Sequence, residues 1–182
     1  MKIQKAKQVI GKTLILRDAT KEDAEFIFSL RTDPVKSRFL SITSPLLKDQ
    51  YLWLERYENS DDQAYFIIEY ENNPIGTVRI YDQKGDSFCW GSWILIDGRP
   101  SHAAIESLLM VYSYASYHLG FTSSHFDVRK KNERAWRFYE RFGATRVSEN
   151  DIDFFYSLSG NAINDTLAKH SVFLPNSVTV IR

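Results

Sequence analysis

The sequence of 182 residues predicts a single α+β domain. Segments with the alternating pattern of strands and segments with the three- and four-residue spacing of helices follow one another in a clear order: strand, two helices, three strands, helix, strand, helix and two strands. Turn residues join several neighbouring strand segments as hairpins. No linker, repeat or low-complexity tract divides the chain, and its length suits one hydrophobic core.

The first part of the chain predicts one strand followed by two helices. Residues 13–18 form the strand. Thr20 and Asp23 resemble a capping box, which begins a helix that Asp33-Pro34 ends. Pro45 suits the first position of the second helix, whose apolar face carries Leu47, Tyr51, Leu54 and Tyr57. Residues 35–43 lie between the two helices and are expected to cover a substrate cleft.

Three strands and a helix follow. Residues 64–70 and 75–81 predict a hairpin that turns at Asn72-Asn73-Pro74, and residues 87–96 form a further strand. Gly91 lies inside that strand between two tryptophans, a position that indicates a bulge or a close backbone approach. Residues 103–118 have helical spacing, and Gly120 ends the helix.

The segment from Phe126 to Ala144 predicts a strand end, a polar turn and a short helix. The strand covers residues 123–128, Asn132 is the expected N-cap of the helix, and Gly143 ends it. Between them Ala135, Trp136, Phe138, Tyr139 and Phe142 form a broad aromatic stripe. Residues 145–148 and 154–158 predict a last hairpin, residues 161–170 a short helix, and residues from Pro175 onward a variable tail.

Composition excludes several classes of function. Twenty-three basic and 23 acidic side chains give a net charge of +0, which argues against charge-driven nucleic-acid binding. The single cysteine, Cys89, cannot form an internal disulfide, and no Cys/His cluster has the spacing of a metal site. The first 20 residues are too polar for a signal peptide and no apolar run could span a bilayer, so a cytoplasmic protein without a membrane partner is expected.

The spacing of Asn132, Ala135, Tyr139 and Gly143 after a strand resembles the acyl-CoA core of the GNAT N-acetyltransferase superfamily. The order of the elements is also that of the GNAT fold, from about residue 13 to about residue 158. The resemblance implies one acyl-CoA N-acyltransferase domain over residues 1–182, with residues 159–182 as a C-terminal extension. It also implies a mixed, mostly antiparallel sheet of six to seven strands flanked by about four helices.

The resemblance implies roles in the binding of acetyl-CoA, the co-substrate. Tyr139 would be the general acid that protonates the leaving thiolate, and the alternative is that it is one more core aromatic residue. Asn132 would bind the pantetheine arm, or only cap its helix. The family signature [QR]-x-x-G-x-[GA] for the pyrophosphate loop aligns with Arg99 to Ala104, where His102 replaces the middle glycine. The expected cofactor-binding residues are Ile94, Ile96, Arg99, Ser101, His102, Ala103, Ala104 and Asn132.

The acceptor is expected to be a small-molecule amine. Residues 30–34 and 90–94 resemble the branch of the superfamily that acetylates amino sugars linked to nucleotides for surface polysaccharides. Arg31 and Arg38 could pair with a nucleotide diphosphate and Phe39 could stack on a base or sugar, with Trp90 as a further substrate residue. The alternatives are a protein N-terminus or a polyamine as acceptor, and a non-catalytic domain that binds acyl-CoA and regulates a partner.

The sequence identifies no general base and no oligomeric state. Glu69, Asp97, His125 and Asp127 are each more often structural or surface groups than bases. Cys89 is expected to be a buried strand residue, because nothing near it in sequence would activate its thiol. A homodimer and a monomer both remain open.

Overall fold

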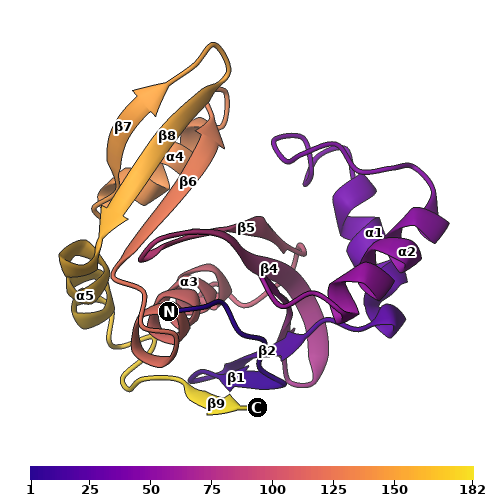
Figure 1. Ribbon diagram of the computed structural model, residues 1–182, viewed down its shortest axis with the longest axis horizontal. Coiled ribbons are helices and arrows are strands. Elements are labelled where there is room, and N and C mark those ends of the chain that lie inside the picture. Colours follow the sequence, from indigo (N-terminus) through magenta and orange to yellow (C-terminus); the bar gives the residue numbers. More distant parts are fainter.

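The computed structural model describes residues 1–182 and shows a single α+β domain built on one nine-stranded sheet (Figure 1). The strand order is β7-β8-β6-β5-β4-β3-β2-β1-β9, with β5 and β6 parallel and the other recorded strand pairs antiparallel. The strands are β1 (Gln8–Ile10), β2 (Leu14–Asp18), β3 (Ala64–Tyr70), β4 (Asn73–Lys84), β5 (Ser87–Leu95), β6 (Ser123–Arg129), β7 (Thr145–Glu149), β8 (Asp153–Ser159) and β9 (Thr179–Ile181). The helices are α1 (Ala24–Thr32), α2 (Leu47–Glu58), α3 (Ala103–Ser113), α4 (Glu133–Arg141) and α5 (Gly160–Lys169). No helix is long and apolar enough to cross a membrane.

Helices cover both faces of the sheet because successive residues of its inner strands are buried on opposite sides. In β3, Phe66 and Ile68 join the main core with α3, whereas Tyr65 and Ile67 join a smaller core under α1 and α2. All four side chains are almost fully buried. The face of the sheet that carries α1 and α2 is therefore built on the smaller core, and α3 belongs to the larger one.

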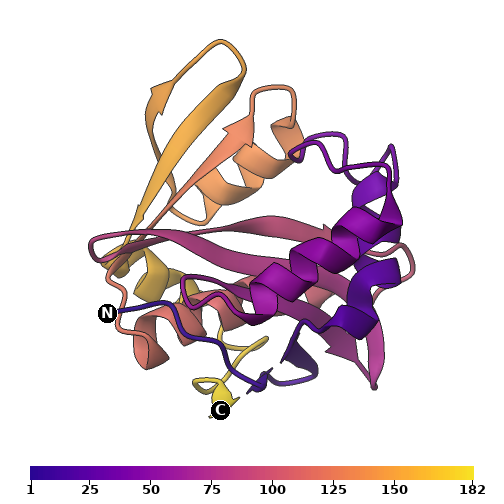
Figure 2. The same cartoon turned by 45° about the vertical axis from the view of Figure 1, so that its right-hand side comes forward.

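Strands β5 and β6 separate soon after they meet. Their pairing covers only residues 87–89 with residues 123–125. From Trp90 to Leu95 the edge of β5 that faces β6 has no partner strand, and the same is true of β6 from Phe126. Figures 1 and 2 show β6, β8, β7 and α4 standing apart from the part of the sheet that carries α1 and α2. The sheet therefore contains a wedge with a free strand edge on each side.

The predicted elements are present, and their bounds differ for physical reasons. The turn between β3 and β4 falls at Glu71 and Asn72, both with positive φ, one residue before the predicted turn. Helix α2 begins at Leu47, two residues after Pro45. The helix expected over residues 103–118 is α-helical to Ser113 and continues as one π turn before Gly120, whose φ is 82°.

The sheet has more strands than predicted, and one of them lies in the segment that was expected to be a variable tail. The sheet has nine strands rather than six or seven, and five α-helices flank it rather than about four. The two added strands are the short β1 and β9, which pair with each other at the edge of the sheet. Residues 179–181 thus form a strand of the sheet, and Val180 packs beside the main core.

Candidate active site

Tyr139 lies in an aromatic cluster beside the wedge between β5 and β6. Helix α4 forms there because the Asn132 side chain accepts a hydrogen bond from the Ala135 N–H at its start and Gly143, with a φ of 85°, ends it. The Tyr139 ring is 4.7 Å from the ring of Phe126 and 5.6 Å from that of Trp90, measured between centroids. The tyrosine predicted as general acid therefore packs next to the free edge of β5.

The Tyr139 hydroxyl is suited to giving a proton and not to taking one. It makes no hydrogen bond within the chain, and burial raises the pKa of its phenol above the ordinary value. The phenol is therefore protonated at neutral pH and is free to donate to a group that enters the wedge.

The N-terminus of α3 presents unpaired backbone donors. The Ala103 N–H donates to the Pro100 carbonyl, but the N–H groups of Ala104 and Ile105 have no acceptor in the chain. No side chain caps this helix. Unpaired N–H groups at a helix N-terminus favour an anion, so this end of α3 fits the pyrophosphate of coenzyme A.

His102 is engaged elsewhere in the structure. Its Nε2 lies 2.8 Å from the hydroxyl of Thr13 and 3.7 Å from a carboxylate oxygen of Glu106. Glu106, which is buried, accepts hydrogen bonds from the N–H groups of Thr13 and Leu14 at 2.6 and 2.9 Å. The imidazole that replaces the glycine of the family signature thus ties α3 to the β1–β2 turn.

Most of the remaining predicted cofactor residues lie near the end of β5 and in the loop that joins it to α3. Ile94 is buried near the end of β5, and Ile96 follows it with its N–H bonded to the Ile75 carbonyl. Arg99 donates to the Ile96 carbonyl at 2.9 Å, which orders the loop before α3. Asn132 caps α4 with its oxygen, and no acceptor within the chain takes its side-chain N–H₂ group. The loop, the strand edge and this free amide are compatible with an extended amide-containing ligand.

A bulge in β5 confirms the prediction that Gly91 marks an irregular position in the strand. The pairing of β4 with β5 shifts by one residue between Thr77 and Arg79, and Ser92 has a φ of 49°. The Ser92 carbonyl accepts a hydrogen bond from the Thr77 hydroxyl at 2.8 Å. The distortion turns the Ser92 side chain toward a cavity on the α1 and α2 face of the sheet.

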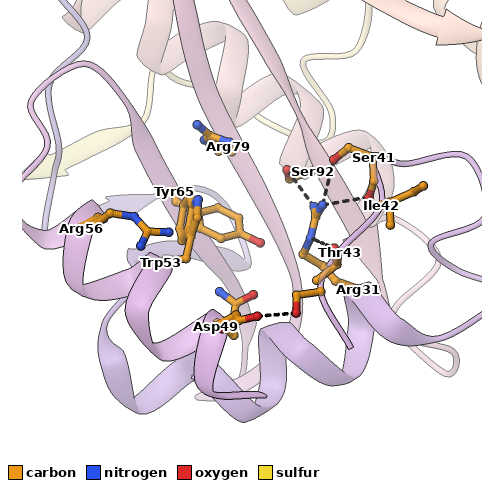
Figure 3. Close-up of a pocket in the computed structure, with 12 residues that line it drawn as sticks. Arg31, Ser41, Ile42, Thr43, Asp49, Trp53, Arg56, Tyr65, Arg79 and Ser92 are labelled. Carbon is orange, nitrogen blue, oxygen red and sulfur yellow. Dashed lines mark hydrogen bonds between the residues drawn. The ribbon is translucent and has the colours of Figure 1, made fainter. Parts of the chain in front are cut away.

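This cavity has a volume of about 340 Å³ and lies between α1, α2 and strands β3 to β5 (Figure 3). Three arginines line it, against a single carboxylate, that of Asp49, which accepts a hydrogen bond from the Ser44 hydroxyl. The lining residues are Arg31, Ser41, Ile42, Thr43, Ser44, Asp49, Gln50, Trp53, Arg56, Tyr65, Arg79 and Ser92. Ser41 to Thr43, at the end of the segment that was predicted to cover a cleft, line this cavity.

The four predicted substrate residues are not together. Arg31 lies in the cavity, where its guanidinium donates to Thr43, to Ser92 and twice to Ser41. Arg38 stacks on Phe39, 4.5 Å from the ring centroid, and neither residue lines the cavity. Trp90 is 4% exposed and packs in the main core beside Tyr139, so its side chain is outside the cavity.

Sequence reasoning missed the other cavity residues, among them Trp53, Arg56, Tyr65 and Arg79. Tyr65 and Arg79 face each other across the β3–β4 pair and therefore project from the same side of the sheet. One signal was present, since Arg79 interrupts an apolar strand run between the buried Val78 and Ile80. A cation inside such a run often serves a site.

The structure accounts for the candidate bases as ordinary polar groups. Glu69 accepts from Arg17 at 2.9 Å, and Asp97 pairs with Lys36 at 2.9 Å. His125 bonds to the Ser87 hydroxyl at 2.7 Å, and Asp127 is exposed on β6. Cys89 is buried as expected, and burial raises the pKa of its thiol to about 11.

Comparison with known proteins agrees with this architecture. The family model of the acetyltransferase (GNAT) domain matches residues 13–145. No curated protein matches the chain in sequence. The solved structure of apo FdhC, a nucleotide-linked sugar GNAT, is 36% identical, with a TM-score of 0.83 over 92% of this chain and 98% of that one.

Two more distant structures share the fold. A GCN5-related N-acetyltransferase from Brucella melitensis is 17% identical, with a TM-score of 0.75 over 93% of this chain and 86% of that one. A chimera of the spermidine N-acetyltransferase SpeG from Vibrio cholerae and hSSAT is 15% identical, with a TM-score of 0.71 over 85% and 99%. The family match and the 36% identical structure show that this chain belongs to the GNAT family and is an N-acetyltransferase.

Proposed function

We propose that the protein transfers the acetyl group of acetyl-CoA to the amino group of a sugar linked to a nucleotide. The observation that carries this acceptor is the cavity beside β5, which is rich in arginine and has one carboxylate, already hydrogen-bonded. A nucleotide-linked sugar carries a diphosphate, which such a cavity would attract, whereas a polyamine is itself cationic and would be repelled. The similarity to a nucleotide-linked sugar GNAT supports the same acceptor.

The residues around the wedge fit acetyl-CoA, which supplies the acetyl group as a reactive thioester. The open edge of β5 from Trp90 to Leu95 offers backbone groups to the amides of the pantetheine arm. The free N–H groups of Ala104 and Ile105 would hold the pyrophosphate, and the Asn132 amide would contact the arm. The His102 ring contacts the hydroxyl of Thr13, and we expect it to stabilise the fold and not to contact the pyrophosphate.

The proposed general acid and the proposed acceptor site lie on opposite faces of strand β5. Tyr139 packs on the main-core face of the strand, and the acceptor cavity opens on the other face beside Ser92. An amine held in the cavity would reach the carbonyl carbon at the strand edge, form the N–C bond and break the C–S bond. The Tyr139 hydroxyl would give its proton to the sulfur, and water would take the proton that the amine loses and return one to the phenolate.

The test is a thiol-release assay with acetyl-CoA across sugar nucleotides that carry an amino group, polyamines and N-terminal peptides. We expect turnover of at least one sugar nucleotide, and a rise of the melting temperature with millimolar acetyl-CoA because a ligand of the native state stabilises it. Efficient turnover of a peptide or polyamine, with every sugar nucleotide inert, would overturn the acceptor. Binding of acetyl-CoA without thiol release for any amine would favour a regulatory binding domain.

A further inference from the structure

The cavity holds two arginines that form no ion pair with the rest of the chain. Neither Arg56 nor Arg79 takes part in any of the ion pairs or side-chain hydrogen bonds of the molecule, and the Nε of Arg79 is buried without a partner. Arg31, by contrast, uses its guanidinium for four hydrogen bonds that fasten the loop before α2 to β5. The charge available to a ligand is therefore that of Arg56 and Arg79.

The guanidinium of Arg79 is held in place by aromatic rings and not by an anion. It lies 5.2 Å from the ring centroid of Trp53 and 4.6 Å from that of Tyr81. Burial lowers the pKa of Arg79, because desolvation disfavours the charged form of the guanidinium. A buried cation without a counter-charge is costly to keep, and a bound anion would offset that cost.

Tyr65 supplies a second buried donor at the same place. The residue is 3% exposed, its hydroxyl has no hydrogen-bond partner, and it lines the cavity. The antiparallel register pairs it directly with Arg79. In Figure 3 Arg56 and Ser92 lie on opposite sides of the view, with Tyr65 and Arg79 between them.

We propose that Arg56, Arg79 and the Tyr65 hydroxyl form the binding site for the diphosphate of the acceptor. This inference rests on the proposed function and names a different anchor from Arg31 and Arg38. Two arginines can each donate two hydrogen bonds to phosphate oxygens, and the phenol adds one. A diphosphate held there directs the attached sugar toward Ser92 and the strand edge, and the nucleoside toward the exposed Arg56 end of α2.

The test is calorimetric titration with UDP, TDP and inorganic pyrophosphate in the presence of saturating coenzyme A, which fills the site at the N-terminus of α3. We expect the wild-type protein to bind a nucleoside diphosphate. Arg56→Gln and Arg79→Gln should each weaken that binding about 10- to 100-fold, and Tyr65→Phe about 3- to 10-fold. Lys48→Gln is the matched control, because Lys48 is an exposed cation on the same helix outside the cavity. It should change binding less than about twofold.

Two further variants keep the test decisive if Arg79→Gln unfolds. Arg56→Glu alters an exposed side chain, so it should fold and should weaken binding more than Arg56→Gln. Arg79→Lys keeps the charge and should retain part of the affinity. Unchanged affinity in Arg56→Glu and Tyr65→Phe would overturn the diphosphate site.

The assays separate this site from the proposed function. If a sugar nucleotide is acetylated with equal KM by the wild-type protein and by Arg56→Gln, the proposed acceptor is supported and the proposed diphosphate site is refuted. If the wild-type protein binds no nucleoside diphosphate and acetylates only polyamines or peptides, both fall. A KM that rises with little change in kcat in Arg56→Gln would support a role of this residue in binding the acceptor.

Discussion

Replacing Tyr139 by phenylalanine removes one hydroxyl and should leave the fold unchanged. The ring packs against Phe126 and Trp90, and these contacts do not involve the hydroxyl. Because that hydroxyl makes no hydrogen bond within the chain, its loss leaves no partner unsatisfied. The free energy of unfolding should change by less than about 1 kcal/mol.

The effect on catalysis should be much larger. Loss of a positioned proton donor slows turnover about 10²- to 10⁴-fold, which is about 2.7 to 5.5 kcal/mol of activation free energy. Burial raises the pKa of Tyr139, so its phenol is a weaker acid than the thiol of coenzyme A. The ordinary pKa of a thiol is about 8.5. Complete proton transfer is then uphill, and we expect a loss in the lower half of the range, about 10²- to 10³-fold.

The assay is thiol release with a saturating acceptor, combined with calorimetry of coenzyme A binding. Tyr112→Phe is the matched control, since Tyr112 is a buried tyrosine whose ring also packs on Trp90, at 5.9 Å. The wild-type kcat should not fall between pH 6 and about pH 9 through ionisation of Tyr139, because a raised pKa keeps the phenol protonated there. Equal kcat values in Tyr139→Phe and wild type would refute the role of general acid.

Three further predictions concern stability and reactivity. Glu106→Ala should lower the free energy of unfolding by about 2 to 4 kcal/mol in urea titrations, because the N–H of Leu14 and the hydrogen-bonding groups of Thr13 lose their acceptor; Glu106→Gln should cost less. His102→Gly should lower the melting temperature but leave the Kd for coenzyme A within about threefold, and a larger rise would mean that the imidazole contacts the phosphates. Native Cys89 should resist alkylation at pH 8 and react faster toward pH 11, since its thiol pKa is raised; a plateau near pH 9 by mass spectrometry would contradict the burial.

Local patterns predicted most of the fold. The cap at Asn132 and the stop at Gly143 define α4, and the apolar run of residues 64–70 matches β3, because each element depends on residues close in sequence. The strands β1 and β9 were missed since three-residue strands carry too little pattern and their pairing joins distant segments.

The site was only partly predictable for the same reason. Tyr139 and Arg31 were marked by family motifs, and the structure places both beside β5. Arg56 and Arg79 come from different elements, and only the packing of α2 on the sheet brings them to one cavity. Arg38 has the right charge in the expected loop, but it stacks on Phe39 outside the cavity, which no spacing could reveal. The cytoplasmic location stays a prediction.

The pairing of β1 with β9 at the edge of the sheet is expected to form after the rest of the domain has folded. Gln8 lies opposite Ile181, so this contact closes a loop of nearly the whole chain. Closing so long a loop is entropically costly until the intervening residues are already folded, and three residue pairs offer little in return. The pairing of β9 with β1 is therefore expected to form late in folding, after β1 has paired with β2. In the finished protein, the amide hydrogens of residues 179–181 should be among the first to exchange with solvent.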